Sequence, residues 1–575
     1  MSLKSNLKRL PAIGALLLII LLAACGDTTA TGPATTAVSQ ATATTTVATA
    51  SATTAPATTV AGLPTVTPGP TSTTAPATAV PATTAAATSA APQTTNPPAT
   101  TAAPTGVPAT TAPASGPVQV YYFKAGSIWA ALPDGSNKRE LVKNVVGSAR
   151  TEKGQLLYFQ KVQSGAETVL QFKLLNPGQN GAETVIDNRA FVAVPGGQAS
   201  KSPSGVYGVD SRAIGVLAVS PDGSQVAYTK ANLSGPTFEG LGGKEYPTEL
   251  WLADLNPNSP SPRRLVANDK DYIAHPVWST DGNRIAFIRT PGFGTGAGYP
   301  TAIWSVFKDG SRLAFLTGPD LGKVNGNSFY ANPAYNLRWV GPLALTFQAS
   351  NQIATPLWLH DLNQKSDFPT LLAMDASRQV AFCPAVRRYF YLRQEPASVQ
   401  AGGIFSVSVD HPEASAVALD PAAVQLLDCK ADLLLYRDSK GQTLVQRVTA
   451  EGKSAGEGVK LGSPVNPKAQ VTASFSPDKA LVAWAPRPEF GTSNPAGSTQ
   501  RFTLFRVDGV AVAEASLDLD PTDITWLDNR VAIFKGTVSI ENQQMQLVSV
   551  SSSGVKTVDS GGGELQIVPQ ASSGL

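Results

Sequence analysis

The sequence has little histidine, cysteine or methionine, with only 3 of each among its 575 residues. So few side chains of this kind leave little material for a zinc ribbon, a multi-metal centre or a disulfide-dense fold. We therefore expect no metal and no cofactor. Charged residues make up only 15% of the chain and the formal net charge is +3. A nucleic-acid-binding protein should carry a strongly basic face, so we expect no nucleic-acid partner.

The first 25 residues have the features of an export signal. Three basic residues precede an apolar run from Leu10 to Leu22, which is shorter than the ~20 residues that span a bilayer. The following Leu-Ala-Ala-Cys-Gly (residues 22–26) resembles the lipobox of bacterial lipoproteins. The resemblance implies a signal peptide over residues 1–24, acylation of Cys25, and anchoring to the outer face of the cell membrane or to the periplasmic side of an outer membrane. The alternative is an ordinary secretory signal with a chance cysteine.

Residues 25–117 are predicted to be a linker that begins with the lipidated cysteine. No charged residue occurs between Thr28 and Val118, and Thr, Ala, Pro, Val and Ser dominate the composition. Such side chains bury too little area to offset the conformational entropy of folding, so we predict disorder here. Frequent proline favours extended geometry, at about 3.1 Å per residue. Thr and Ser beside Pro also resemble O-glycosylated stalks.

From residue 118 onward the chain is repetitive. Short runs of Val, Ile, Leu and aromatic residues alternate with Gly, Pro, Asp, Asn and Ser, which is typical of strands and turns. Residues 217–228, 276–287 and 473–484 align with one another as strand, tight turn and strand. A second half-repeat containing Trp or an equivalent residue follows, and all eight Trp residues fall on repeat positions. A period of about 40 to 55 residues with four strands per unit predicts a β-propeller.

The best-preserved units carry a family resemblance. Ser-Pro-Asp-Gly followed by Val-Ala-Tyr (residues 220–228), and in the next unit Ile-Ala-Phe, Ile-Trp and Asp-Gly-Ser, resemble TolB-type, WD-repeat-like propeller repeats. Units 217–266 and 275–317 match closely, and the others are degraded. The first unit, Val118–Asn144, lacks its first strand, and the last apolar run, Glu564–Val568, lacks a partner. Pairing these two would hide both edges. We predict one closed all-β propeller over residues 118–575, with seven to nine four-stranded blades and eight favoured.

The long insertions of this propeller are expected on one face. Turns between the first and second strands, and between the third and fourth, are mostly tight, so the long connections fall at the other two places in each blade. These connections carry aromatic residues that we predict to form a binding surface, because rigid rings supply contact energy at low entropic cost. The candidates are Phe238, Tyr246, Phe293, Tyr299, Phe329 and Tyr330. The alternative is that these rings pack beneath their own loops.

Two cysteines occupy matching positions of adjacent units. Cys383 follows Val-Ala-Phe and Cys429 follows Leu-Leu-Asp in the aligned runs, and equivalent points on neighbouring blades approach each other near the axis. Export places the chain in an oxidising setting, so we hypothesise a disulfide between them, provided that their Cα atoms lie within about 7 Å. Two separate buried thiols are the alternative.

Familiar catalytic patterns do not occur. The sequence has no Gly-x-Ser-x-Gly elbow, and its three histidines, His275, His360 and His411, lie far apart. Residues 292–297 fit a dinucleotide fingerprint formally, but no helix follows to hold a phosphate. We expect a membrane-anchored, non-enzymatic scaffold that binds a protein or another envelope component, and the TolB resemblance implies such a partner. The alternatives are a hydrolase or lyase acting on envelope glycans or small molecules in the central channel, and a structural spacer.

Overall fold

The computed structural model describes residues 118–571, apart from residues 166, 178–180, 193–215, 233, 235–237, 241–242, 246, 269, 292–300, 325–326, 332–333, 350–354, 365, 367, 395–400, 488–498, 540–543 and 563–564. Within these ranges the regular elements are all β-strands, forty in number. A helix long and apolar enough to cross a membrane does not occur in this part of the chain.

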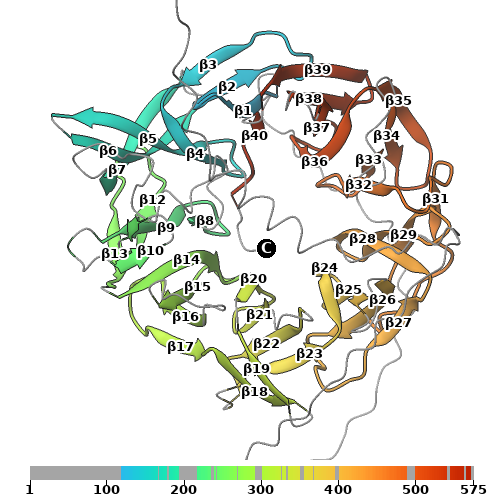
Figure 1. Ribbon diagram of the computed structural model, residues 1–575, viewed down its shortest axis with the longest axis horizontal. Coiled ribbons are helices and arrows are strands. Elements are labelled where there is room, and N and C mark those ends of the chain that lie inside the picture. The colour runs from blue at the N-terminus through green and yellow to red at the C-terminus, as the bar shows by residue number, and fades with distance from the viewer. Residues whose placement is uncertain are drawn as a thin grey trace, which may run out of the picture. The chain divides into compact units, whose positions relative to one another are not determined.

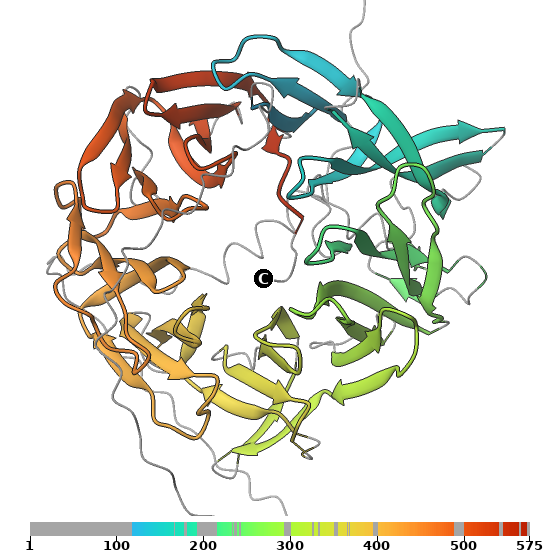
Figure 2. The ribbon, with the colours of Figure 1, turned by 180° about the vertical axis from the view of Figure 1, so that it is seen from behind.

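Nine four-stranded antiparallel sheets stand around a ring and form a β-propeller (Figures 1 and 2). The all-β propeller predicted from the sequence is therefore confirmed. The count of nine lies within the predicted range and is one above the favoured eight. The extra blade comes from the degraded repeats, each of which supplies a complete sheet.

The strands are given blade by blade, from the channel to the outer rim. Blade 1 contains β40 (Gln566–Ile567), β1 (Val120–Lys124), β2 (Ser127–Ala131) and β3 (Arg139–Val142); blade 2 contains β4 (Val145–Arg150), β5 (Leu156–Ser164), β6 (Glu167–Asn176) and β7 (Ala182–Val192); and blade 3 contains β8 (Leu217–Val219), β9 (Gln225–Ala231), β12 (Thr248–Asp254) and β13 (Arg263–Val266). Blade 4 contains β14 (Asp271–Trp278), β15 (Arg284–Pro291), β16 (Ala302–Phe307) and β17 (Ala314–Thr317); blade 5 contains β20 (Ala334–Trp339), β21 (Ala344–Ala349), β22 (Leu357–Asp361) and β23 (Thr370–Ala373); and blade 6 contains β24 (Ala376–Cys383), β25 (Arg388–Gln394), β26 (Ala401–Ser408) and β27 (Val417–Asp420). Blade 7 contains β28 (Ala423–Lys430), β29 (Leu433–Asp438), β30 (Thr443–Arg447) and β31 (Val459–Leu461); blade 8 contains β32 (Gln470–Phe475), β33 (Leu481–Arg487), β34 (Gln500–Arg506) and β35 (Ala511–Leu517); and blade 9 contains β36 (Asp520–Trp526), β37 (Ala532–Ser539), β38 (Gln544–Ser551) and β39 (Gly554–Gly561).

The ring is closed by pairing the two ends of the propeller. In blade 1, β40 pairs antiparallel with β1, with Tyr122 opposite Ile567 and Phe123 opposite Gln566. The chain then continues to the inner strand of blade 2, where the Ala571 amide donates a hydrogen bond to the carbonyl of Arg150 on β4. The predicted closure between the first and last apolar runs is therefore confirmed, and blade 1 contains strands from both ends of the domain.

The repeated Ser-x-Asp turns follow from local chemistry. In blade 3 the Ser220 hydroxyl donates to the Asp222 carboxylate at 2.6 Å, and Gly223 adopts a φ of +67°, which glycine reaches without strain. The hydrogen bond from Ser220 is the main cause that lowers the pKa of Asp222 to about 2. The same Ser–Asp contact, at 2.6 Å, recurs in blade 4 between Ser279 and Asp281. The carboxylates of Asp222 and Asp281 therefore stabilise the turns between the first and second strands of their blades.

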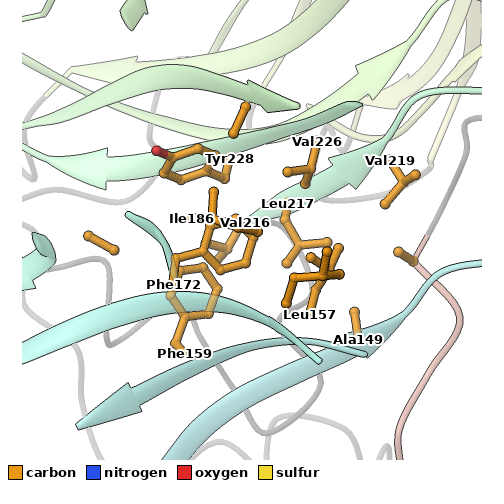
Figure 3. Packing of buried hydrophobic residues seen from close by; sticks show 14 of the residues in the cluster. Ala149, Leu157, Phe159, Phe172, Ile186, Val216, Leu217, Val219, Val226 and Tyr228 are labelled. Carbon is orange, nitrogen blue, oxygen red and sulfur yellow. The ribbon is translucent and has the colours of Figure 1, made fainter. Parts of the chain in front are cut away.

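Aromatic side chains fill the spaces between neighbouring blades. Phe159 and Phe172 of blade 2 stack with centroids 4.7 Å apart, and Phe172 lies 4.9 Å from Tyr228 of blade 3 (Figure 3). Two Trp residues on inner strands, Trp278 and Trp339, each add a hydrogen bond to this packing. Trp278 donates to the carbonyl of Ala218 on β8 at 3.0 Å, so this buried Trp links blade 4 to blade 3.

Buried acids on outer strands clamp the next blade. Asp187 on β7 accepts hydrogen bonds from the Tyr228 hydroxyl at 2.9 Å and from Lys230 at 3.0 Å, both on β9. Asp559 on β39 plays the equivalent part between blade 9 and blade 1, pairing with Lys124 at 3.0 Å and Lys138 at 3.2 Å. These ion pairs therefore reinforce the closure.

A covalent link also joins two blades. Cys383 at the end of β24 and Cys429 on β28 form a disulfide, with their Cα atoms 5.5 Å apart. The Cys383 side chain is fully buried. The bond connects the inner strands of blades 6 and 7, as hypothesised from the matching repeat positions.

We predict that Asp559→Asn weakens the closure. Burial opposes ionisation of Asp559, but its hydrogen bonds, led by that from Lys124, outweigh burial and lower its pKa. A charged hydrogen bond of this kind contributes about 1.5–3 kcal/mol, so chemical denaturation at neutral pH should show a loss of that order. Because the folded-state pKa is lowered, this contribution is present above the ordinary Asp pKa of ~3.9 and disappears as pH falls through the folded-state value.

The matched control is Asp508→Asn. Asp508 pairs with Arg506 within one turn, and both side chains are largely exposed. Exposed pairs contribute little, so this variant should unfold within ~0.5 kcal/mol of the wild type. Equal losses of unfolding free energy in both variants would contradict a stabilising role for the pairing of Asp559 with Lys124 and Lys138.

Candidate functional site

Two β-hairpins are inserted into the long connections. The hairpin β10 (Phe238–Gly240) and β11 (Gly243–Glu245) lies between the second and third strands of blade 3. The hairpin β18 (Asp320–Val324) and β19 (Asn327–Tyr330) lies between blade 4 and blade 5. Because successive strands in a blade are antiparallel, both kinds of connection leave the sheets on the same face, as expected from the sequence.

The predicted aromatic surface is only partly described. Phe238 begins β10, where its backbone lies opposite Glu245. Tyr246, Phe293 and Tyr299 lie outside the described residues. The two candidates that the structure places fully are Phe329 and Tyr330, both on β19.

Phe329 is not a surface residue, which corrects its assignment to the binding surface. Its side chain is 6% exposed and meets the Trp358 ring of blade 5 edge-on, with centroids 5.7 Å apart. Neighbouring residues of a strand point to opposite sides, so burying Phe329 against blade 5 turns Tyr330 outward. Tyr330 is 55% exposed.

Three exposed rings border this hairpin, and we call Phe315, Tyr330 and Phe368 the rim patch. Phe315 is 53% exposed on β17, and Phe368, which is 51% exposed, shortly precedes β23. Both strands form the outer edges of their blades. The rim patch therefore lies at the outer rim of blades 4 and 5.

Close backbone approaches tie the three rings to the hairpin. A Cβ on Gly318 would lie 2.9 Å from the Phe315 ring, and one on Gly322 would lie 3.2 Å from the Phe368 ring. Tyr330 pairs with Asp320, midway between these glycines. All three rings therefore lie on this hairpin or directly beside it.

A ladder of contacts holds Phe315 in place. Its ring meets Trp304 edge-on at 5.4 Å, and the Arg289 guanidinium lies 5.1 Å from the Trp304 ring centroid. Arg289 in turn forms an ion pair with Asp271 on β14. An exposed ring that is supported from behind loses little entropy on binding, which suits a recognition surface.

Sequence reasoning missed Phe315 and Phe368. Phe315 lies in an apolar outer strand whose last two residues, Leu316 and Thr317, are buried, and nothing in the run marks which ring faces solvent. Phe368 lies in a turn outside the long insertions. In the sequence, the long connection that contains β18 and β19 was the only feature that pointed to this part of the surface.

The three histidines of the chain lie in three different blades. His360 is buried on β22, and burial lowers its pKa. His275 lies on the inner strand β14, and His411 lies in a turn after β26. Among the described residues, no three His, Cys, Asp or Glu side chains gather in a way that could hold a metal ion.

Comparisons with known proteins show no family for this chain. No protein-family model matches the chain, and no curated protein matches it. Solved structures with similar architecture include a eukaryotic initiation factor, at 11% identity and a TM-score of 0.45 over 79% of this chain and 97% of that one. They also include Porphyromonas gingivalis dipeptidyl peptidase 4, at 10% identity and a TM-score of 0.44 over 73% of this chain and 63% of that one. TolB from Acinetobacter baumannii is similar at 16% identity, with a TM-score of 0.25 over 61% and 77% of the two chains.

We predict opposite outcomes for alanine substitutions at the two adjacent rings of β19. Phe329→Ala leaves a cavity beside Trp358 and should destabilise the propeller by about 3–5 kcal/mol. Tyr330→Ala removes an exposed ring and should change stability by no more than ~0.5 kcal/mol. Urea denaturation of both variants checks this, and similar losses would show that Tyr330 also packs inward.

Proposed function

We propose that the protein is an exported, lipid-anchored scaffold that binds a protein partner of the cell envelope through the rim patch. The carrying observation is that three aromatic rings, each more than half exposed, border one inserted hairpin. Aromatic residues are enriched at protein–protein interfaces relative to the rest of the protein surface, and exposed apolar patches often mark such interfaces.

The cysteine inventory supports the anchor. The chain has 3 cysteines, and two of them, Cys383 and Cys429, are joined in the propeller. Cys25 is the one left over, and it follows the apolar run that ends at Leu22. A single unpaired cysteine in an exported protein needs an explanation, and acylation supplies one.

The uncharged segment supports a tether. Residues 28–117 are rich in Thr, Ala and Pro, and a chain of this composition and length can extend to ~280 Å at about 3.1 Å per residue. Reach of this order lets an anchored propeller meet partners across an envelope.

Replacing the proposed anchor residue tests the localisation. Cys25→Ser removes the thiol that would carry the acyl chains, so the protein should move from the membrane fraction to the soluble exported fraction. Radiolabelled palmitate should be incorporated into the wild type and lost from this variant. A membrane-bound and unlabelled wild type would contradict acylation.

Replacing the rim patch tests the binding surface. The triple variant Phe315→Ala, Tyr330→Ala and Phe368→Ala should lose most of the cross-linked partner recovered from envelope preparations, because interface aromatics carry a large share of binding energy. The control is Val510→Ala with Val512→Ala, which removes two exposed apolar side chains from the rim of blade 8. Unchanged recovery in the triple variant would place the interface elsewhere.

A further inference from the structure

The inner strand of blade 5 contains an irregularity that groups polar side chains. Tyr335 lies opposite Gln348 on β21, but Arg338 lies opposite Thr346, so three steps along β20 match two steps along β21. Asn336, within this bulge, has a φ of +52°. Residues three apart in a regular strand point to opposite faces. The extra residue therefore brings Tyr335 and Arg338 to the same face.

That face looks toward blade 6. Gln348 donates a hydrogen bond to the carbonyl of Ser377 on β24 at 2.9 Å, and Thr346 is hydrogen-bonded to Tyr389 on β25. The Arg338 guanidinium lies 5.2 Å from the centre of the Phe382 ring on β24. We call the contact between β20 and β24, formed by Tyr335, Arg338, Arg378 and Phe382, the blade 5–6 seam.

The blade 5–6 seam contains donors without acceptors. The Nε atom of Arg338 and the hydroxyl of Tyr335 are buried and have no hydrogen-bond partner. Burial raises the pKa of Tyr335, and the Thr355 side chain and the positive charge of Arg378 oppose that rise, so both Thr355 and Arg378 lie near a neutral phenol. Buried polar groups are nearly always hydrogen-bonded, and leaving a charged one unpaired is costly.

Carboxylates near the seam are already engaged elsewhere. Asp375, just before β24, accepts from Tyr391 at 3.2 Å and forms an ion pair with Arg393. Within the described ranges, neither Arg338 nor Arg378 forms an ion pair. The seam between blades 7 and 8 differs, because there Asp428 on β28 accepts from the backbone amide of Phe475 at 3.0 Å.

We propose that the blade 5–6 seam binds an oxyanion, a carboxylate or phosphate group of a ligand, between Arg338, Arg378 and Tyr335. Arginine donors form strong charge-assisted hydrogen bonds to such groups, and the neutral Tyr335 hydroxyl adds a third donor. Arg378 is exposed, so an anion can reach the seam from solvent. This site goes beyond the proposed protein scaffold and does not depend on the rim patch.

Anion titration of the full-length protein tests the proposal. Inorganic phosphate and acetate are titrated separately at constant ionic strength, and binding is followed by calorimetry and by the thermal unfolding temperature. The variants are Arg378→Gln, which changes an exposed side chain, and Tyr335→Phe, which removes only the hydroxyl. The control is Arg530→Gln, another exposed arginine, in a turn of blade 9.

We expect saturable binding of at least one anion to the wild type and to the control. Binding should be about tenfold weaker or more in Arg378→Gln, and weaker to a smaller degree in Tyr335→Phe. Binding of phosphate alone or acetate alone would support the site and identify the group it prefers. No binding beyond the effect of sodium chloride, or equal loss in the control, would overturn the proposal.

Discussion

The whole propeller depends on one short antiparallel pairing between the two ends of the domain. In the described part of the chain, Gln566 and Ile567 pair with β1 and the Val568 amide adds one more hydrogen bond to Tyr121, yet this short contact supplies the inner strand of blade 1 and removes two free sheet edges at once. Asp559 strengthens the same junction from the outer strand of blade 9 through Lys124 and Lys138. The ring thus combines a backbone pairing near the channel with an ion-pair clamp farther out.

The other junctions between blades use different chemistry at equivalent places. Blades 3 and 4 are joined by a Trp278 hydrogen bond, blades 6 and 7 by a disulfide at Cys383, and blades 7 and 8 by Asp428. This variety is tolerable because each sheet contacts only its neighbours, so one junction can change without changing the others. The blade 5–6 seam is the place where such variation leaves cationic donors without an internal acceptor, and the rim patch is the place where an insertion leaves rings exposed.

Local chemistry explains what could be predicted from the sequence. The Ser220–Gly223 turn and its counterparts are stabilised by residues close together in the sequence, so they can be predicted without knowing the fold. The closure could be predicted because the first unit lacks a strand and the last apolar run lacks a partner. The blade count was less accessible, because degraded units such as 336–372 lack the Ser-Pro-Asp-Gly signature. Exposure of neighbouring rings was not readable: Phe329 and Tyr330 are alike in sequence, and only packing against Trp358 decides which one is buried. The bulge at Asn336 likewise depends on its pairing with β21.

Native-state hydrogen exchange at one backbone amide tests the closed ring most directly. The Val568 amide, just beyond β40, donates to the carbonyl of Tyr121 at 3.0 Å. If the two ends are paired as described, this amide should exchange as slowly as amides in the middle strands of the blades, such as that of Ala286. Exchange at the rate of an open chain, with blade interiors still protected, would show that the ring is not closed by these strands.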